Sequence, residues 1–423
     1  MQYGCIGEHL THSFSKIIHG ELTDYLYELR EIPMGELDQF MTARDFKAIN
    51  VTIPYKQTVM AYCRTFSPLA EAIGSVNTMI REKDGSWTGY NTDAYGLRYM
   101  MQRGGLSFAG QDVLVLGNGG VSKTIQAVAK LDGAASVSVA SRSGALNYDN
   151  LVQSVPDTTL IVNATPVGMY PKSGESLVDL REFPKLSGVA EVIYNPCRTA
   201  LLQQAQQLGL SYAVGFPMLI AQAKQAEELF FDREISAEKM AEVGARLQRD
   251  CENIVLIGMP GSGKTTIGQR LAEMTGRTLM DTDAEIVRTY KMEIPQIFAQ
   301  HGEAVFREME HAVLAKAAQT RGIILVTGCG AVTTAANESP LRENGRIYEI
   351  ARPLGRLARD GRPLSMQNDL SELAARRAPL YEKFRDLKIE NTASVDMAAE
   401  AVWRDFCAYT RHQWTESEPA GDA

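Results

Sequence analysis

The sequence predicts an α/β protein built from consecutive units, each with a parallel sheet covered by helices. Short runs of β-branched residues alternate with longer segments of helical periodicity, which is typical of strand–helix–strand units. Two buried-strand patterns, at 112–117 and 253–258, each run into a glycine-rich turn that opens a helical segment. The chain of 423 residues also exceeds what one hydrophobic core usually organises, so we expect two or three domains.

Composition and charge exclude several classes of protein. The apolar fraction of 45% and the charged fraction of 22% are ordinary for a globular chain. A net charge of −8 argues against a general nucleic-acid binder, and no stretch approaches the roughly 18 consecutive apolar residues of a membrane span. The N-terminus lacks the pattern of a secretory signal. The six cysteines lie far apart with no C-x-x-C, so we expect a cytoplasmic protein without disulfides or a zinc site.

The first region places polar residues at the ends of predicted strands. Residues 46–54 read as a strand, and Asn91-Thr92-Asp93 precedes a predicted helix at 94–103. Lys56 and Asp93, if brought together, can pass a proton to and from a carbonyl oxygen during hydride transfer. The simpler interpretation of either residue alone is a solvated surface side chain. The candidate site residues are Ser13, Ser15, Thr52, Lys56, Asn77 and Asp93.

The second region has the rhythm of a doubly wound, Rossmann-type sheet. A strand at 112–117 enters the turn Gly117-Asn118-Gly119-Gly120, and a helix at 122–132 and a strand at 136–140 follow. Such a turn seats the pyrophosphate of a dinucleotide at a helix N-terminus. Further strands are predicted at 159–163, 190–194 and 210–214.

The end of the second strand in this region indicates which dinucleotide binds. Folds that prefer NAD place an acid about twenty residues after the glycines. Here the strand ends in Ser141-Arg142-Ser143, and an arginine with two hydroxyls suits the 2′-phosphate of NADP(H). The alternative is that Arg142 is only a solvated strand-end charge. The predicted cofactor-binding residues are Gly117, Asn118, Gly119, Gly120, Val121, Ser141, Arg142, Ser143 and Gly215.

The third region opens with a complete phosphate-binding loop. Residues 254–266 give strand, loop and helix start in the required order, with Gly-Met-Pro-Gly-Ser-Gly-Lys-Thr-Thr at 258–266. Lys264 would neutralise charge on the β- and γ-phosphates of ATP, and the Thr265 hydroxyl would bind Mg²⁺. The alternative is a glycine-rich turn that only caps a helix. The predicted ATP-binding residues of the loop are Gly261, Ser262, Gly263, Lys264, Thr265 and Thr266.

Two acids at alternate positions follow this loop, in Asp281-Thr282-Asp283. In such a pair one acid can face a metal ion while the other faces the hydroxyl that accepts the phosphoryl group. Without other motifs, the same pair is usually a solvated strand end or a helix cap. The further motifs are Gly302-Glu303, Phe306-Arg307-x-x-Glu310, Thr327-Gly328-Cys329-Gly330, Arg362-Pro363-Leu364 and Arg377-Ala378-Pro379-Leu380-Tyr381.

With these motifs, residues 252–408 resemble shikimate kinase. The resemblance implies that Asp281 helps to hold Mg²⁺ and that Asp283 orients and deprotonates the shikimate hydroxyl. It implies further that Arg307 and Arg377 clamp the shikimate carboxylate, that Glu310 holds Arg307, and that Arg362 closes over the nucleotide. Gly328, Cys329 and Gly330 would line the substrate.

The chain departs from the kinase family at two places. The family has three glycines where this chain has Gly328-Cys329-Gly330, and a Cβ at the centre could crowd the substrate or forbid a positive φ. The segment 348–362 is also shorter than the family's, so we expect a trimmed lid. One alternative is therefore an active dehydrogenase fused to a degenerate kinase-like module, and another is a kinase for a different small polyol or acid.

The first half resembles shikimate dehydrogenase over about residues 1–240. The motifs that carry this resemblance are His12-Ser13-Phe14-Ser15, Asn50-Val51-Thr52-Ile53-Pro54-Tyr55-Lys56, Ile73-Gly74-Ser75-Val76-Asn77-Thr78, Gly89-Tyr90-Asn91-Thr92-Asp93, Asn163-Ala164-Thr165-Pro166-Val167-Gly168-Met169, Tyr194-Asn195-Pro196 and 215–222. The resemblance implies that Lys56 and Asp93 are the catalytic pair. It implies that the substrate's hydroxyls and carboxylate are bound by Ser13, Ser15, Thr52, Asn77, Asp93 and Gln222.

The two resemblances together imply a fused enzyme of the shikimate pathway. We expect a substrate-binding domain at 1–95 with a returning helix at 216–232, and a dinucleotide-binding Rossmann-type domain at 96–215. A linker at 233–252 would lead to a P-loop kinase α/β/α domain at 253–408 with a parallel sheet, and then to a disordered tail at 409–423. NADPH-dependent reduction of 3-dehydroshikimate would be followed by ATP- and Mg²⁺-dependent phosphorylation of shikimate.

Overall fold

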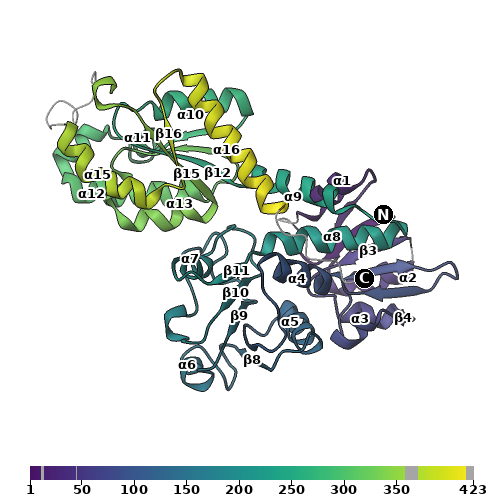
Figure 1. Cartoon of the computed structure of the whole chain (residues 1–423). Helices are drawn as coiled ribbons and strands as arrows, with labels where there is room; N and C mark the ends of the chain where they lie inside the picture. The colour runs from purple at the N-terminus through teal and green to yellow at the C-terminus, as the bar shows by residue number, and fades with distance from the viewer. Residues whose placement is uncertain (11–13, 44, 358–369, 416–423) are drawn as a thin grey trace.

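The computed structural model describes residues 1–10, 14–43, 45–357 and 370–415. Ser13 and Arg362, two of the predicted site residues, lie outside the described residues. Three sheets follow one another along the chain, and Figure 1 shows each with its own helices. The α/β class is confirmed.

The first sheet is mixed, with strand order β2-β1-β3-β5-β6-β4. Its strands are β1 Tyr3–Gly7, β2 Glu28–Glu31, β3 Ala48–Val51, β4 Thr65–Phe66, β5 Thr78–Arg81 and β6 Trp87–Tyr90, and its helices are α1 Ser15–Leu22, α2 Leu37–Ala43 and α3 Pro68–Ile73. Because β5 runs antiparallel to β3 and β6, the expectation of parallel sheets throughout is wrong here. The short turn from β5 to β6 cannot make the crossover that parallel strands require.

The second sheet is parallel throughout, in the order β11-β10-β9-β7-β8. It consists of β7 Asp112–Leu116, β8 Ser136–Ala140, β9 Leu160–Asn163, β10 Gly188–Glu191 and β11 Ser211–Ala213, with helices α5 Gly120–Leu131, α6 Leu151–Ser154 and α7 Ala200–Gln207. The doubly wound arrangement is confirmed. The strand expected at 190–194 lies slightly earlier, and 192–194 belong to the loop after β10.

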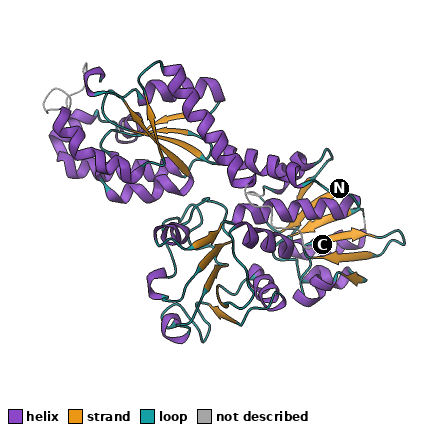
Figure 2. Ribbon diagram, viewed as in Figure 1, coloured by secondary structure: helices purple, strands orange, loops and turns teal. Residues whose placement is uncertain are grey.

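The third sheet is also parallel, in the order β13-β14-β12-β15-β16. Its strands are β12 Asn253–Ile257, β13 Leu279–Asp281, β14 Ile324–Val326, β15 Gly345–Ala351 and β16 Leu387–Glu390. Its helices are α10 Lys264–Thr275, α11 Thr282–Tyr290, α12 Ile294–Ala318, α13 Glu338–Asn344, α15 Leu370–Phe384 and α16 Val395–Thr415. Figure 2 shows these helices around the strands, which is the expected layered arrangement.

Two helices tie the first sheet to later parts of the chain. Helix α4, Thr92–Arg103, packs so closely on α8, Gly215–Phe231, that a Cβ at Gly96 would lie 2.5 Å from the carbonyl oxygen of Met218. Helix α8 therefore returns to the first unit after the second sheet has been completed, and Figure 1 shows the two helices side by side.

The segment between the second and third sheets is mostly helical. Helix α8 ends at Phe231 with Asp232 as its C-cap, at a φ of 49°, and α9, Ala237–Cys251, begins after the N-cap Ser236. The expectation of a disordered tail from 409 is wrong as far as 415, because α16 continues to Thr415. Trp414 is buried and covers Gly244 of α9, where any Cβ would strike the indole ring.

Short 3₁₀ turns complete the described structure, at Met34–Glu36, Thr58–Tyr62, Leu180–Glu182, Ala331–Thr333, Ala335–Asn337 and Leu354–Arg356. Within the described ranges, none of the helices combines the length and the hydropathy needed to span a bilayer. All six cysteines are free thiols.

Candidate active sites

Lys56, Asn77 and Asp93 converge at one end of the first sheet. Lys56 Nζ lies 2.6 Å from Asp93 Oδ2, and Asn77 Nδ2 donates to Asp93 Oδ1 at 2.9 Å. The Asp93 carboxylate is buried, whereas the Lys56 side chain keeps 19% of its surface exposed. The structure thus places Lys56 and Asp93 as an ion pair in which the lysine side chain is partly exposed.

The local sequence fixes the Asp93 carboxylate. Asp93 lies in the first turn of α4, whose N-cap Asn91 accepts a hydrogen bond from the Ala94 amide. An acid in that position is stabilised by the helix dipole. The Thr92 amide donates to Asn77 Oδ1 at 2.7 Å, so one asparagine side chain holds both the helix start and the carboxylate.

A buried polar chain extends behind this pair. Thr78 Oγ1 donates to Asn77 Oδ1 at 3.0 Å, Asn50 Nδ2 donates to Thr78 Oγ1 at 3.0 Å, and the Tyr27 hydroxyl donates to Asn50 Oδ1 at 2.7 Å. Such a network holds each of its members in one orientation. Sequence reasoning did not single out these supporting residues. Asn50 and Thr78 stand in the motifs noted above, but nothing in the sequence pointed to Tyr27.

Thr52, Ser15 and Gln222 come from three different elements of the same unit. Thr52 directly follows β3, and its Cγ2 lies 2.6 Å from where a Cβ on Gly7 would be. Ser15 is the first residue of α1. Gln222 lies on α8 against Gly96, one turn of α4 beyond Asp93.

The glycine turn after β7 leaves the N-terminus of α5 accessible. Gly117 has a φ of 103°, and a Cβ there would lie 2.7 Å from Thr165 Cγ2. Glycine therefore suits this position for two reasons, the left-handed backbone and the lack of space for a side chain. A Cβ at Gly119 or Gly120 would meet nothing within 4 Å. An open helix N-terminus after a parallel strand is a suitable seat for a pyrophosphate group. These residues therefore fit a dinucleotide.

Residues 141–143 lie at the same edge of the second sheet as this turn, because β7 and β8 are parallel neighbours. Arg142 and Ser143 are exposed, and no acid stands at this strand end. Gly215 opens α8, where a Cβ would lie 2.6 Å from the carbonyl oxygen of Ile193. The position thus allows no larger residue without a shift of the loop after β10.

Sequence reasoning missed a buried acid behind these loops. Glu191 accepts hydrogen bonds from Asn163 Nδ2 at 3.0 Å, Thr199 Oγ1 at 3.0 Å and the Ile193 amide at 3.1 Å. Burial raises the pKa of Glu191 to about 7, although these donors oppose the rise. Asn163 Oδ1 in turn accepts from the Thr165 amide at 3.0 Å. Glu191 therefore joins the loops that follow β9 and β10, and a lone acid in an apolar strand was its only sequence signal.

The phosphate-binding loop between β12 and α10 is preformed. Gly258 and Gly263 have φ values of 145° and 100°. Lys264 is buried, and its Nζ donates to the carbonyl oxygens of Gly258 at 2.8 Å and Met259 at 3.1 Å. Ser262 is fully buried, and its Oγ has no hydrogen-bond partner among the described residues. A loop with a buried ammonium and an unsatisfied hydroxyl fits a bound phosphate.

The two oxygen atoms that are predicted to bind a divalent cation, on Thr265 and Asp281, lie next to this loop. Thr265 Oγ1 donates to Asp281 Oδ2 at 3.2 Å, and Asp281 Oδ1 caps α11 by accepting from the Asp283 amide at 3.0 Å. Hydroxyl and carboxylate oxygens are the ligands that Mg²⁺ prefers. In the described ranges no three His, Cys, Asp or Glu side chains gather as a metal site.

Asp283 is half-buried close to two other acids, Asp281 and Glu310. Burial, followed by the charges of Asp281 and Glu310, raises the pKa of Asp283 to about 6. A Cβ at Gly328 would lie 2.6 Å from Asp283 Oδ1 and 2.9 Å from Glu310 Oε1, and a Cβ at Gly330 would fall on the guanidinium of Arg307. A side chain at either glycine would therefore have to displace the charged ends of these residues.

Two arginines complete this site. Arg307 Nη1 lies 2.8 Å from Glu310 Oε2 and its Nη2 lies 3.0 Å from Glu303 Oε1. Arg377 Nη1 donates to the carbonyl oxygen of Cys329 at 2.9 Å. The hydroxyl of Tyr381, which ends the motif noted above but was given no role there, donates to the same oxygen at 3.0 Å. The glycine loop thus contacts Asp283 on one side and the arginines on the other.

The concern that Cys329 would require a positive φ is wrong. Among the described residues, the non-glycine positions with positive φ are Asp232 and Lys291. Cys329 therefore has an ordinary backbone conformation, and its carbonyl oxygen organises Arg377 and Tyr381. The expected trimmed lid at 348–362 ends outside the described residues.

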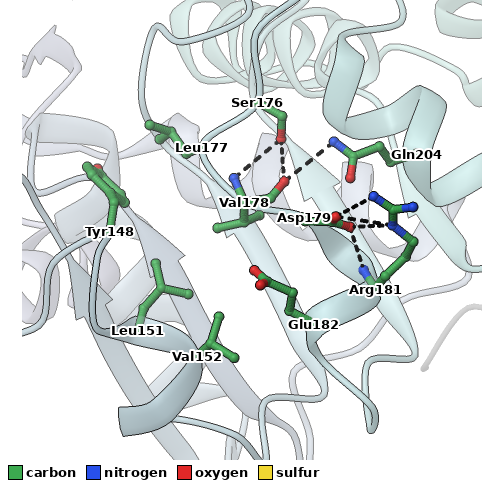
Figure 3. Close-up of a pocket in the computed structure, with 10 residues that line it drawn as sticks. All are labelled: Tyr148, Leu151, Val152, Ser176, Leu177, Val178, Asp179, Arg181, Glu182 and Gln204. Carbon is green, nitrogen blue, oxygen red and sulfur yellow. Dashed lines mark hydrogen bonds and ion pairs between the residues drawn. The ribbon is translucent and has the colours of Figure 1, made fainter.

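A separate cavity of about 330 Å³ lies in the second unit, beside α6 and α7 (Figure 3). It is lined by Tyr148, Leu151, Val152, Ser176, Leu177, Val178, Asp179, Arg181, Glu182 and Gln204. Asp179 and Arg181 pair with each other there, with Nε 2.9 Å from Oδ1. None of the predicted site residues that the structure describes lines this cavity.

Comparison with known proteins agrees with both halves. A family model for the shikimate dehydrogenase substrate binding domain matches residues 5–79, and one for shikimate kinase matches residues 260–406. A shikimate dehydrogenase (NADP(+)) from Clostridium perfringens is 32% identical over 249 residues, which cover 54% of this chain and 91% of that protein.

Solved structures resemble the first half. A chorismate mutase/shikimate 5-dehydrogenase fusion protein from Clostridium acetobutylicum has a TM-score of 0.54 and 33% identity, covering 58% of this chain and 96% of that one. Shikimate 5-dehydrogenase from Thermus thermophilus, in complex with NADP(H) and shikimate, has a TM-score of 0.51 and 27% identity over 58% of this chain and 99% of that one. The chain therefore belongs to the shikimate dehydrogenase family and carries a shikimate kinase domain after its dehydrogenase part.

Proposed function

We propose that the chain reduces 3-dehydroshikimate to shikimate with NADPH and then phosphorylates shikimate from ATP to give shikimate 3-phosphate. The single observation that carries the proposal is the presence of two converged sites on separate sheets. One holds the Lys56–Asp93 ion pair, and the other holds Lys264 and Asp283 beside two arginines. The ketone oxygen reduced in the first reaction becomes the hydroxyl that is phosphorylated in the second.

In the first reaction the Lys56–Asp93 pair would pass the proton. When bound, NADPH supplies the hydride. The Lys56 ammonium would donate a proton to the oxygen of the reduced ketone, while Asp93, itself held by Asn77, keeps the ammonium in position. Ser13, Ser15, Thr52 and Gln222 would bind the ring hydroxyls and the carboxylate. The NADPH-binding residues would be those predicted above from the turn at 117–121, the strand end at 141–143 and Gly215.

In the second reaction Asp283 would accept the proton of the shikimate hydroxyl. When bound, ATP with Mg²⁺ supplies the phosphoryl group. Lys264 and the loop at 261–266 would hold its phosphates, Arg362 would cover the nucleotide, and Thr265 with Asp281 would bind the cation. Arg307 and Arg377 would bind the carboxylate, since two guanidinium groups would be poorly matched to a neutral polyol.

We further propose that the chain is divided largely as its sequence predicts, with dehydrogenase domains at 1–95 and 96–215 and the returning helix α8. The kinase domain would begin at 253 and continue with α16 to Thr415. The junction at 233–252 consists mainly of α9. A cytoplasmic location is supported by the free thiols.

A one-pot reaction tests this function. The purified chain is given 3-dehydroshikimate, NADPH, ATP and Mg²⁺, and products are identified by mass spectrometry. We expect shikimate 3-phosphate, with one NADPH and one ATP consumed for each molecule formed. Accumulation of shikimate with no phosphorylated product would favour the degenerate kinase-like module instead.

A further inference from the structure

Three parts of the chain meet at one aromatic cluster. The ring of Phe14, directly before α1, lies edge-on to Tyr194 at 5.7 Å and to Phe216 at 6.4 Å between ring centroids. Tyr194 belongs to the loop after β10 of the second sheet, and Phe216 to the start of α8. The cluster therefore joins the proposed substrate-binding domain to the proposed dinucleotide-binding domain.

A residue of the proposed kinase domain covers this cluster. Arg321 lies between α12 and β14, and its guanidinium carbon is 4.7 Å from the centroid of the Phe14 ring. Burial raises the pKa of Tyr194, and the positive charge of Arg321 opposes this rise, so the arginine acts on both rings. Arg321 itself is exposed.

Hydrogen bonds across the same boundary fix the loop that carries Tyr194. The Cys197 amide donates to Asn344 Oδ1 at 2.9 Å, and the Arg198 amide donates to the carbonyl oxygen of Glu343 at 2.9 Å. On the other side, the Gly322 amide donates to the carbonyl oxygen of Cys251 at 3.1 Å, next to Arg321. Arg321 is thus presented to Phe14 from a fixed backbone.

We infer that Arg321 is a positioning residue for the dehydrogenase, supplied by the kinase half of the same chain. By stacking on Phe14 it holds this ring against Tyr194 and so fixes the start of α1, where Ser15 follows directly. The inference rests on the proposed function. It adds that the reduction of 3-dehydroshikimate depends on a side chain that lies outside both dehydrogenase domains.

The role predicts a change in substrate binding without a change in the chemical step. A cation over an exposed aromatic ring contributes enough energy for about a two- to five-fold effect on affinity. Arg321→Gln should therefore raise KM for 3-dehydroshikimate by about two- to five-fold and leave kcat unchanged, as expected when uniform binding is lost. Arg321→Lys should restore most of the affinity because it keeps the cation.

The design includes a matched control and an internal test of folding. Arg30→Gln removes a similar contact, 5.1 Å from the Phe40 ring, at the far strand β2, and should leave KM for 3-dehydroshikimate unchanged. Phosphorylation of added shikimate by the Arg321→Gln chain should also be unchanged, which shows that the kinase domain is folded.

A double-mutant cycle decides whether the effect passes through Phe14. In a Phe14→Leu background, Arg321→Gln should have no further effect on KM. An unchanged KM in Arg321→Gln, or an equal effect in both backgrounds, would overturn the inference while the wild-type chain still reduced its substrate. A wild-type chain that reduced no 3-dehydroshikimate would instead contradict the proposed function.

Discussion

The ionisation of Asp283 controls whether this residue can accept a proton from shikimate. A carboxyl group accepts a proton only when ionised, and burial together with Asp281 and Glu310 raises the pKa of Asp283 to about 6. Below that pH the residue is protonated, and above it the residue is ionised. The raised pKa is suited to a general base that works near neutral pH.

We therefore expect kcat/KM for shikimate phosphorylation to fall about tenfold for each pH unit below about 6, and to level off above about 7. The measurement is a pH–rate profile with saturating ATP and Mg²⁺. Asp283→Asn should be inactive at every pH. A wild-type profile that stayed flat down to pH about 5 would exclude Asp283 as the base.

Cys329 and Gly330 offer two neighbouring substitutions with opposite expectations. Cys329→Gly should give no large gain in phosphorylation, because the residue has no positive φ and acts on Arg377 through its carbonyl oxygen. Gly330→Ala should abolish most activity, because the new Cβ would displace the Arg307 guanidinium. Steady-state kinetics with shikimate measure both, and a large gain in Cys329→Gly would support an impaired kinase.

Single residues differ in how far the sequence could predict them. The sequence motifs point to Lys264, Asp283 and the Lys56–Asp93 pair. In the structure Lys264 lies in the phosphate-binding loop, and Lys56 forms an ion pair with Asp93, as expected. Tyr27 and Glu191 stand in none of the motifs, and their roles come from tertiary contacts with Asn50 and Asn163, so the sequence could not assign them a role.

At the scale of elements, the contact between α4 and α8 connects Asp93 to Gln222. Gly96 allows this contact, since its Cβ would lie 2.5 Å from the carbonyl oxygen of Met218. The predicted helix at 94–103 was readable from its apolar periodicity. Its partner α8 comes more than a hundred residues later, and its return to the first unit was expected only from the family resemblance. The antiparallel β5–β6 hairpin was missed because its strands are short, and the end of α16 because a single tryptophan anchors it.

Gly96→Ala should destabilise the chain by about 1–3 kcal/mol, because the helices must move apart to admit the methyl group. We expect the reduction rate to fall and phosphorylation of added shikimate to persist. Urea unfolding and the two separate assays measure these effects. Gly20→Ala, on α1 with nothing within 4 Å of the new Cβ, should be neutral or slightly stabilising. Equal stability for the two variants would contradict the packing account.

At the scale of the whole molecule, one chain carries two consecutive reactions on separate sheets. The tandem order was predictable because each glycine loop is a local pattern that follows its own strand. The interface between the second sheet's loops and the third unit was not, because the backbone hydrogen bonds of Cys197 and Arg198 leave no pattern in the sequence. Joining the sites raises the concentration of shikimate near the kinase by an amount that depends on their separation.

Loss of each reaction separately, followed by complementation, tests the central claim most directly. Lys56→Ala should stop consumption of 3-dehydroshikimate while still phosphorylating added shikimate, and Lys264→Ala should accumulate shikimate. A mixture of the two variants should restore shikimate 3-phosphate, because shikimate released by one chain reaches the other. If Lys264→Ala also abolished reduction, or if the mixture formed no phosphorylated product, two independent sites on one chain would be contradicted.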